Sequence, residues 1–122
     1  MIDPTHLCQI EIHVTDMELS RRFYEEVMGW KVSPAEIHML TVLEVPEHCH
    51  FGISLVSDLN PSQSNSNHTI LYFRHKDPKA VAERAASFNG AKVSAPMKLP
   101  SYGKAIFISD PDGQKFGIME LG

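Results

Sequence analysis

The sequence predicts an α+β fold with mixed sheets, built from two tandem βαβββ modules. The first observation behind this prediction is an internal repeat: GWKVS at 29–33 returns as GAKVS at 90–94, 61 residues later. The second is that both halves show the same order of signals: an alternating segment, a helix-capping Asp, a helical pattern and a closing Gly. A repeat of this length is typical of a duplicated supersecondary unit.

The first half opens with a half-buried strand, which the strict alternation of apolar and polar residues over 7–14 predicts. Successive side chains of a strand point to opposite faces of a sheet. One face of this strand is therefore apolar, and the other face carries Gln9, Glu11 and His13.

A helix over about 17–28 is expected to follow this strand. Asp16 can cap its N-terminus, and apolar residues recur at helical spacing up to Gly29, which can end it. Three short strands are then expected over 30–33, 37–45 and 51–57. The polar, Ser- and Asn-rich stretch 58–67 is interpreted as a linker, so that the first module covers about 5–57.

The second half repeats this order over about 68–121. An alternating segment at 69–75 precedes Asp77, a helix cap, and Pro78, a residue favoured at the first helical position. The buried face of this second helix is predicted to consist of Val81, Ala85 and Phe88. The closing strands are expected near 91–95, 104–109 and 115–121, and the residues DPDG at 110–113 predict a tight hairpin turn.

Composition restricts the class of protein. A length of 122 residues suits one domain, 1–122, and a net charge of −4 argues against nucleic acid or an anionic membrane as the main partner. No apolar run reaches the roughly 20 residues that a membrane span needs. Cys8 and Cys49 do not make a disulfide framework, and the N-terminus lacks the pattern of a signal peptide. These features predict a cytoplasmic protein.

The order of elements and four short motifs resemble the glyoxalase / bleomycin-resistance / extradiol-dioxygenase superfamily, also called vicinal oxygen chelate. The matching stretches are Val14–Glu18, Phe23-Tyr24 with Gly29-Trp30, Asp77–Gly90 and SDPDGQKFGIME at 109–120. The resemblance implies that the two sheets curl into a cup around a small-molecule site. It also implies a homodimer, in which strands of both subunits line each cup.

The resemblance further implies where a metal would be held, on the first and last strands of each module. Those four positions correspond to Gln9, Gly52, Ile70 and Gly117, so the glutamate expected on each closing strand is replaced by glycine. A divalent cation needs three or four converging ligands. We therefore predict no metal and no cofactor at the family's usual site, and open space at both glycines.

The run EHCH at 47–50 contains four residues that can bind metals. Consecutive residues of a strand alternate between its faces, so His48 and His50 could share a face that excludes Glu47 and Cys49. This run is interpreted as a polar turn that enters a strand.

Alternation and the repeat predict the polar residues of the cup. Glu11 and His13 are the predicted acid and base of this polar face. The resemblance supports Glu11, because a subgroup of the superfamily has a Glu in this place and closing strands that read Phe-Gly-apolar, whereas His13 stands where that subgroup usually has a proline. The predicted substrate-binding residues are Gln9, His50, Ser54, Tyr72, Arg74 and Lys115. The alternative is that Glu11 forms an ordinary cross-strand pair with Arg74 or Lys115.

Three functions remain open at this point. The first is a metal-independent protein that binds or transforms a small organic molecule through Glu11 and His13. The second is a protein that sequesters a drug or metabolite without catalysis. The third is a divergent metal-dependent lyase or dioxygenase that uses Gln9, His13 and His50, or His48, as ligands. The substrate is not predicted, because the loops at 34–50 and 96–103 that would select it contain no recognised motif.

Overall fold

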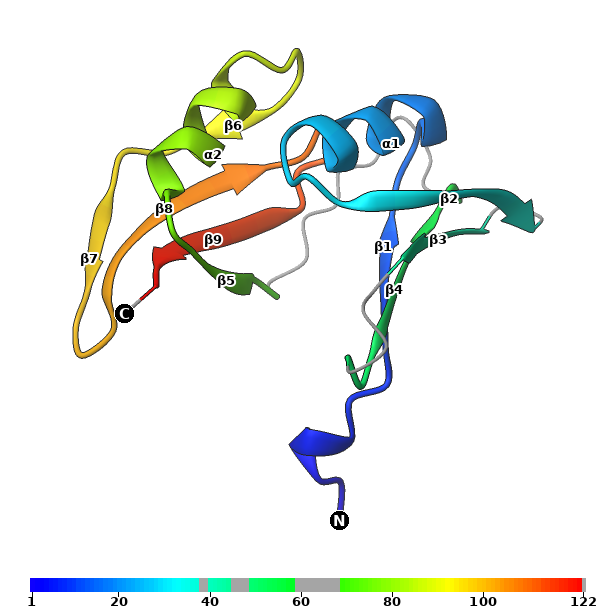
Figure 1. The fold of residues 1–122 in the computed structure, drawn as a ribbon, viewed down its shortest axis with the longest axis horizontal. Coiled ribbons are helices and arrows are strands. Elements are labelled where there is room, and N and C mark those ends of the chain that lie inside the picture. The colour runs from blue at the N-terminus through cyan, green and yellow to red at the C-terminus, as the bar shows by residue number, and fades with distance from the viewer. Residues whose placement is uncertain (38–39, 45–48, 59–68, 122) are drawn as a thin grey trace.

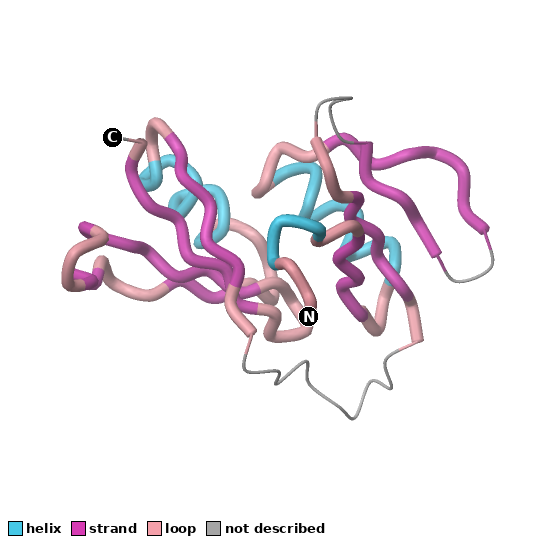
Figure 2. The backbone as a smooth tube through the Cα atoms, turned by 90° about the horizontal axis from the view of Figure 1, so that it is seen from below, coloured by secondary structure: helices cyan, strands magenta, loops and turns pink. Residues whose placement is uncertain are grey.

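The computed structural model describes residues 1–37, 40–44, 49–58 and 69–121. Both helices lie along one side of the molecule, and two separate groups of strands extend from them (Figures 1 and 2). In chain order the elements are η1 (Pro4–His6), β1 (Gln9–His13), α1 (Met17–Glu26), β2 (Lys31–Ile37), β3 (Leu40–Glu44), β4 (Gly52–Val56), β5 (Leu71–His75), α2 (Pro78–Ala86), β6 (Lys92–Val93), β7 (Met97–Leu99), β8 (Gly103–Ser109) and β9 (Lys115–Glu120). Glu47, His48 and all of the expected linker except Asp58 lie outside the described residues.

The first sheet has the strand order β1-β4-β3-β2. β1 and β4 are parallel, with Gln9 opposite Gly52 and Glu11 opposite Ser54, whereas the other two pairs are antiparallel. The α+β fold with mixed sheets is therefore confirmed. The strand expected over 37–45 corresponds to β3, whereas residues 34–37, expected in a specificity loop, extend β2.

The second sheet has the order β5-β9-β8-β6, and β7 also pairs with β8. One edge strand was expected near 91–95, but two short strands lie end to end along β8. Ser94 still exchanges hydrogen bonds with Phe107, and two residues later Pro96 has no N–H to donate. The edge strand is therefore interrupted, and β7 pairs with the first part of β8.

The helix caps confirm the duplication. The carboxylates of Asp16 and Asp77 accept hydrogen bonds from the backbone N–H groups of Leu19 (3.2 Å) and Ala80 (3.1 Å). Past each helix, Gly29 has φ +70° and Gly90 has φ +93°, backbone conformations that favour glycine. No helix in the described ranges is long and apolar enough to cross a bilayer.

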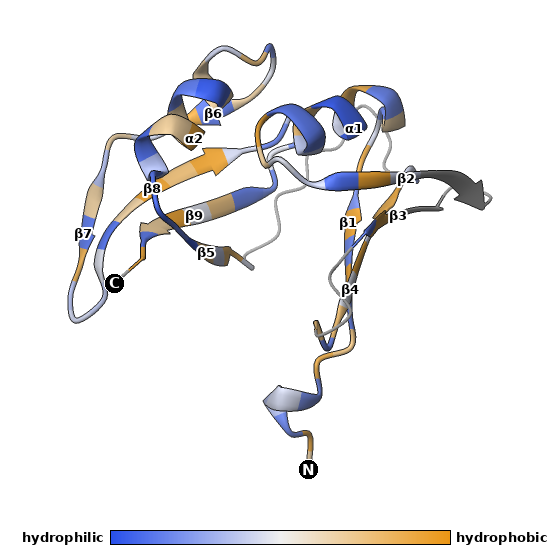
Figure 3. Ribbon diagram, viewed as in Figure 1, coloured by the Kyte–Doolittle hydropathy of each residue, from blue (hydrophilic) through white to orange (hydrophobic). Residues whose placement is uncertain are grey.

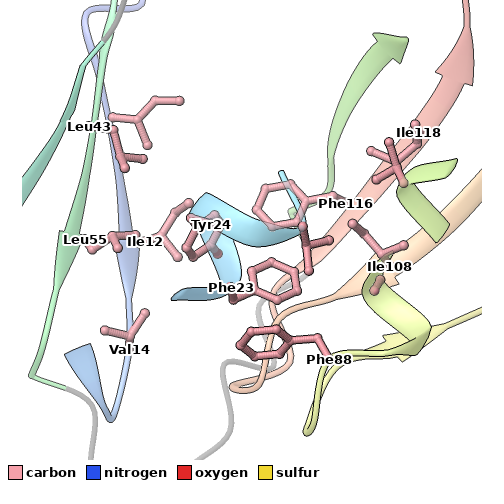
Figure 4. Close-up of a cluster of buried hydrophobic side chains, with 14 residues drawn as sticks. Ile12, Val14, Phe23, Tyr24, Leu43, Leu55, Phe88, Ile108, Phe116 and Ile118 are labelled. Carbon is pink, nitrogen blue, oxygen red and sulfur yellow. The ribbon is translucent and has the colours of Figure 1, made fainter. Parts of the chain in front are cut away.

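The hydrophobic core lies between the sheets and the helices. Ile12, Leu43 and Leu55 of the first sheet point toward α1, while Phe116 approaches from the second sheet (Figure 4). Hydropathy alternates along the strands, as a sheet with one apolar face requires (Figure 3). The opposite faces of both sheets, which carry the predicted site residues, therefore point away from the core.

A buried polar network joins the two modules at the DPDG turn. Tyr24 on α1 donates its hydroxyl to Asp110 Oδ2 (2.7 Å), and the other Asp110 oxygen accepts from the N–H groups of Asp112 and Gln114 (2.9 and 2.8 Å). Asp112 in turn accepts from the backbone N–H and the hydroxyl of Thr15 (3.1 and 2.7 Å). The turn therefore has a second role that its composition did not predict: it fixes α1 against the second sheet.

Candidate functional site

The polar face of the first sheet brings together Gln9, Glu11, His13 and Ser54, as the alternation predicts. Their strands are adjacent, and the register places Glu11 opposite the fully buried Ser54. His50 is exposed and lies in the bend before β4, outside this paired register. It is therefore not part of the described cluster on this face.

The expected open space at Gly52 is occupied by a side chain. A Cβ added to Gly52 would lie 2.8 Å from Gln9 Oε1, because the Gln9 amide extends across the neighbouring strand. Gln9 Nε2 donates a hydrogen bond to Ser54 Oγ (2.9 Å), which holds the amide in this position. Gln9 thus fills the place of the absent carboxylate.

His13 lies between two carboxylates on this face. Its Nδ1 is 2.6 Å from Asp58 Oδ1, and its Nε2 is 3.6 Å from Glu11 Oε1. All three side chains are between 41% and 52% exposed, so the group is accessible to a bound molecule. Asp58 was not predicted as a site residue, because in sequence it is only the first polar residue of the linker.

The face of the second sheet carries Tyr72, Arg74 and Lys115. The strand register places Tyr72 opposite Gly117 and Arg74 opposite Met119, which confirms that they share one face. Lys115 Nζ lies 5.9 Å from the centre of the Phe107 ring. Glu11 lies on the other sheet, so the alternative of a cross-strand pair between Glu11 and either cation is wrong.

Gly117 is covered in the same way as Gly52, by a side chain from the opening strand of its module. A Cβ added to Gly117 would lie 2.4 Å from Tyr72 Cδ2 and 2.5 Å from Cε2. The repeat offset from Gln9 indicates Ile70, but Tyr72, two residues further on, lies opposite the glycine. Side chains two positions apart on a strand point to the same face of the sheet. The alternation therefore predicted the face of Tyr72 correctly, although the repeat indicated the wrong partner for Gly117.

One pocket lies on the second sheet and has a volume of about 530 Å³. Its described lining residues are Tyr72, Phe73, Arg74, Leu99, Pro100, Tyr102 and Met119. Leu99, Pro100 and Tyr102 come from β7 and the turn after it, inside the 96–103 segment expected to select a substrate. No motif marked Tyr102, and its proximity to Tyr72 depends on the pairing of β7 with β8.

The arrangement does not fit the metal site that the fold implies. Neither closing strand offers a carboxylate at the glycine positions, and the Gln9 amide and the Tyr72 ring occupy the space there. Among the described residues no group of three or more His, Cys, Asp or Glu side chains converges on a point that could hold a metal ion. The first sheet offers an imidazole between two acids, and the second offers an aromatic pocket with a cation.

Comparison with known sequences points to one family. A model of the glyoxalase-like domain matches residues 7–121. The chain is 29% identical over 103 residues to the putative glyoxylase CFP32 of Mycobacterium bovis, which covers 84% of this chain and 39% of that protein. It is also 29% identical over 129 aligned positions to the probable chloroplastic lactoylglutathione lyase of Arabidopsis thaliana, with coverages of 98% and 37%. The chain thus spans about two fifths of the length of these curated relatives.

Solved structures share the fold. TnmS3, an antibiotic binding protein from Streptomyces sp. CB03234, aligns over the full length of both chains with a TM-score of 0.69 and 22% identity. The glyoxylase/bleomycin resistance protein/dioxygenase domain from Frankia sp. EAN1pec gives a TM-score of 0.72 and 18% identity, over 93% of this chain and 95% of that one. Because the family model spans nearly the whole sequence and these neighbours share its fold, the chain belongs to the glyoxalase-like domain family.

Proposed function

We propose that this protein binds a small organic molecule in a cup shared by two subunits and acts on it without the usual metal. The observation that carries the proposal is the pair of exposed, chemically complementary sheet faces. Glu11 and His13 lie on one, and the aromatic pocket with Arg74 lies on the other. Within one chain these faces point away from the core and are not opposed, so a second copy of the chain is the surface that could close each cup.

Charge complementarity supports this second copy as the partner. The face of the first sheet carries two acids, Glu11 and Asp58. On the second sheet Lys92 lies opposite Ser109, and Ser109 lies opposite Lys115, so both lysines share the face of the pocket. In a dimer with two-fold symmetry, the first sheet of each subunit could face the second sheet of its partner. The acids would then face the lysines at two equivalent places in the dimer.

Reversing the charge of one of these lysines tests the dimer. In sedimentation velocity at low ionic strength the protein is expected to behave as a dimer. Lys115→Glu should weaken the association by about tenfold or more, because it places like charges face to face. Lys104→Glu serves as the control, since Lys104 lines the groove beside α2 on the opposite face of the same sheet. A monomeric wild-type protein, or equal effects of both variants, would contradict the shared cup.

The proposed chemistry is proton transfer by Glu11 and His13. Asp58, at 2.6 Å from Nδ1, favours the tautomer with a proton on that nitrogen, which turns the basic Nε2 toward Glu11. An imidazole and a carboxylate side by side can remove a proton from a bound molecule and return it at a neighbouring atom. Asp58 acts through His13 and is a positioning residue.

Replacing Glu11 with glutamine tests this chemistry. We expect Glu11→Gln to lower turnover by about a hundredfold, the usual scale of general acid–base catalysis, and to leave unfolding unchanged because the side chain is half exposed. The hemithioacetal of methylglyoxal and glutathione is a first probe, because moving its carbon-bound proton to the neighbouring carbonyl carbon gives lactoylglutathione, which names the Arabidopsis relative, and appearance of this thioester is the readout. Glu25→Gln, an exposed position on α1, is the matched control.

Two outcomes would redirect the proposal. Activity that a chelator abolishes and that added Zn²⁺, Ni²⁺ or Fe²⁺ restores would favour a divergent metalloenzyme. A ligand that is bound stoichiometrically and recovered unchanged, by mass spectrometry, would favour sequestration. The apolar wall of Leu99, Pro100 and Met119 lends specific support to sequestration, as does the likeness to an antibiotic binding protein.

A further inference from the structure

We propose that the pocket on the second sheet selects a planar aromatic molecule that carries one acidic group. The ring would lie against Tyr72 and the acid against Arg74. This inference rests on the proposed function, because it assumes that this face receives the small molecule. It names the chemical class of that molecule, which neither the fold nor the comparisons provide.

Tyr72 has the properties of a preformed stacking platform. Its ring lies directly over Gly117, where no side chain separates it from the backbone of β9. The ring of Phe107 contacts it edge-to-face, with centroids 5.8 Å apart and an interplanar angle of 77°. Tyr72 nevertheless remains 47% exposed. A ring held on one side and open on the other can stack a ligand with little further loss of conformational entropy.

The remaining walls favour an apolar, flat occupant. Leu99, Pro100 and Met119 supply apolar surface, and Tyr102 adds a second aromatic ring that is 69% exposed. The turn that presents Tyr102 contains Ser101 at φ +70°, a conformation that non-glycine residues seldom adopt and that often occurs at binding sites. A volume of about 530 Å³ is in the range of small-molecule sites.

Arg74 gives the pocket its charge selectivity. It is the one charged side chain among the described lining residues, and no carboxylate of the described residues lies within 4 Å of it. Its Nη1 donates to the carbonyl oxygen of Glu120 at 3.2 Å, which fixes the guanidinium and leaves its other N–H groups available. A planar guanidinium binds a carboxylate through two parallel hydrogen bonds, one to each oxygen.

The spacing of these two residues matches one molecule. Tyr72 and Arg74 are two positions apart on β5, so their Cα atoms are separated by roughly 6.6 Å along the strand. A ring that stacks on Tyr72 can therefore extend its acid to Arg74 within the same pocket. Lys92 and Lys115 line a different pocket and do not add a second cation here. The pocket consequently suits a single negative charge better than a multiply charged phosphate.

The test is a titration of the protein with three matched probes, monitored by the NMR signal of the Met119 methyl group. The probes are 2-naphthoate, its neutral amide 2-naphthamide, and the saturated acid decahydronaphthalene-2-carboxylate. We expect 2-naphthoate to shift the Met119 signal and to bind at least tenfold more tightly than either of the others. Arg74→Gln should lower the affinity for 2-naphthoate to that for 2-naphthamide and leave the amide unaffected. Tyr72→Leu should weaken binding of both naphthyl probes, and Lys104→Gln should change nothing.

Each contrary result is informative. Equal affinity for the saturated acid would overturn the aromatic selection while leaving the face as a ligand site, and an unchanged 2-naphthoate affinity in Arg74→Gln would overturn the role of the guanidinium. No movement of Met119 with any probe would refute the proposed class. A change in sedimentation of Arg74→Gln would assign this residue to the subunit interface instead of the ligand. The proposed function is tested separately, by the dimer and Glu11 experiments.

Discussion

Replacing Phe23 with alanine is expected to lower the free energy of unfolding by about 4 kcal/mol, the usual scale for a fully buried phenylalanine. Phe23 is 0% exposed, and its ring makes edge-to-face contacts with Tyr24 (centroids 5.0 Å apart) and Phe88 (5.5 Å). Phe88 belongs to the second module, so the substitution opens a cavity where the two halves of the chain meet (Figure 4). Urea unfolding followed by circular dichroism measures the change.

The controls separate loss of packing from loss of an aromatic ring in general. Phe23→Leu retains most of the volume and should cost less than half as much. Tyr102→Ala removes a ring that is 69% exposed and should change stability by less than about 0.5 kcal/mol. A loss below 1 kcal/mol for Phe23→Ala would mean that the modules do not depend on this contact.

Asp110→Ala is expected to lower the free energy of unfolding by about 3 kcal/mol, because it leaves three donors without their acceptor in a buried site. These donors are the Tyr24 hydroxyl and the backbone N–H groups of Asp112 and Gln114. Asp110 itself is 1% exposed. Asp110→Asn keeps an acceptor oxygen at the same position and is the matched control, with a smaller expected loss. Equal losses for the two variants would exclude a specific role for these hydrogen bonds.

The difference in stability between the wild type and Asp110→Asn is also expected to depend on pH. Burial raises the pKa of the Asp110 carboxyl above its ordinary value of 3.8, although the hydrogen bond from Tyr24 opposes this shift. A raised folded-state pKa means that the folded protein retains a proton that the unfolded chain has released. The part of the stability that comes from this retained proton is therefore fully present below about pH 3.8 and is lost as the pH rises through the folded-state pKa of Asp110, while the three hydrogen bonds to its oxygens remain. Between about pH 3.8 and the folded-state pKa of Asp110, the free energy of unfolding of the wild type should fall relative to that of Asp110→Asn, as measured by urea unfolding at several pH values.

The local elements could be predicted because their signals lie within a few residues. Asp16 and Asp77 are caps in the structure, as their spacing from the helical patterns indicates, and Gly29 and Gly90 adopt positive φ. The alternation over 7–14 also placed the polar side chains correctly on one face. The end of α1 was predicted two residues too late, since Glu26 is its last residue and Val27 is the cap.

What the sequence did not predict depends on contacts between distant segments. Composition indicates that Asp110 belongs to a turn, but only the docking of α1 against that turn buries its carboxylate. Asp58 becomes a neighbour of His13 because β4 runs parallel to β1 and ends beside it. Likewise, the sequence predicts empty space at Gly52 and Gly117, because it does not show that the side chains of Gln9 and Tyr72 on the neighbouring strands cover them.

The two covered glycines also limit how this protein could be redesigned. A carboxylate introduced at Gly52 or Gly117 would meet the Gln9 amide or the Tyr72 ring, at 2.8 and 2.4 Å from the new Cβ. The two positions differ in how easily they could accept an acid. The Gln9 amide is the end of a flexible, exposed side chain that can swing away from Gly52, whereas the Tyr72 ring must move as a whole before Gly117 can carry a side chain. The Tyr72 ring is therefore the greater obstacle to a bound ion on this fold, and the same ring forms part of the aromatic pocket.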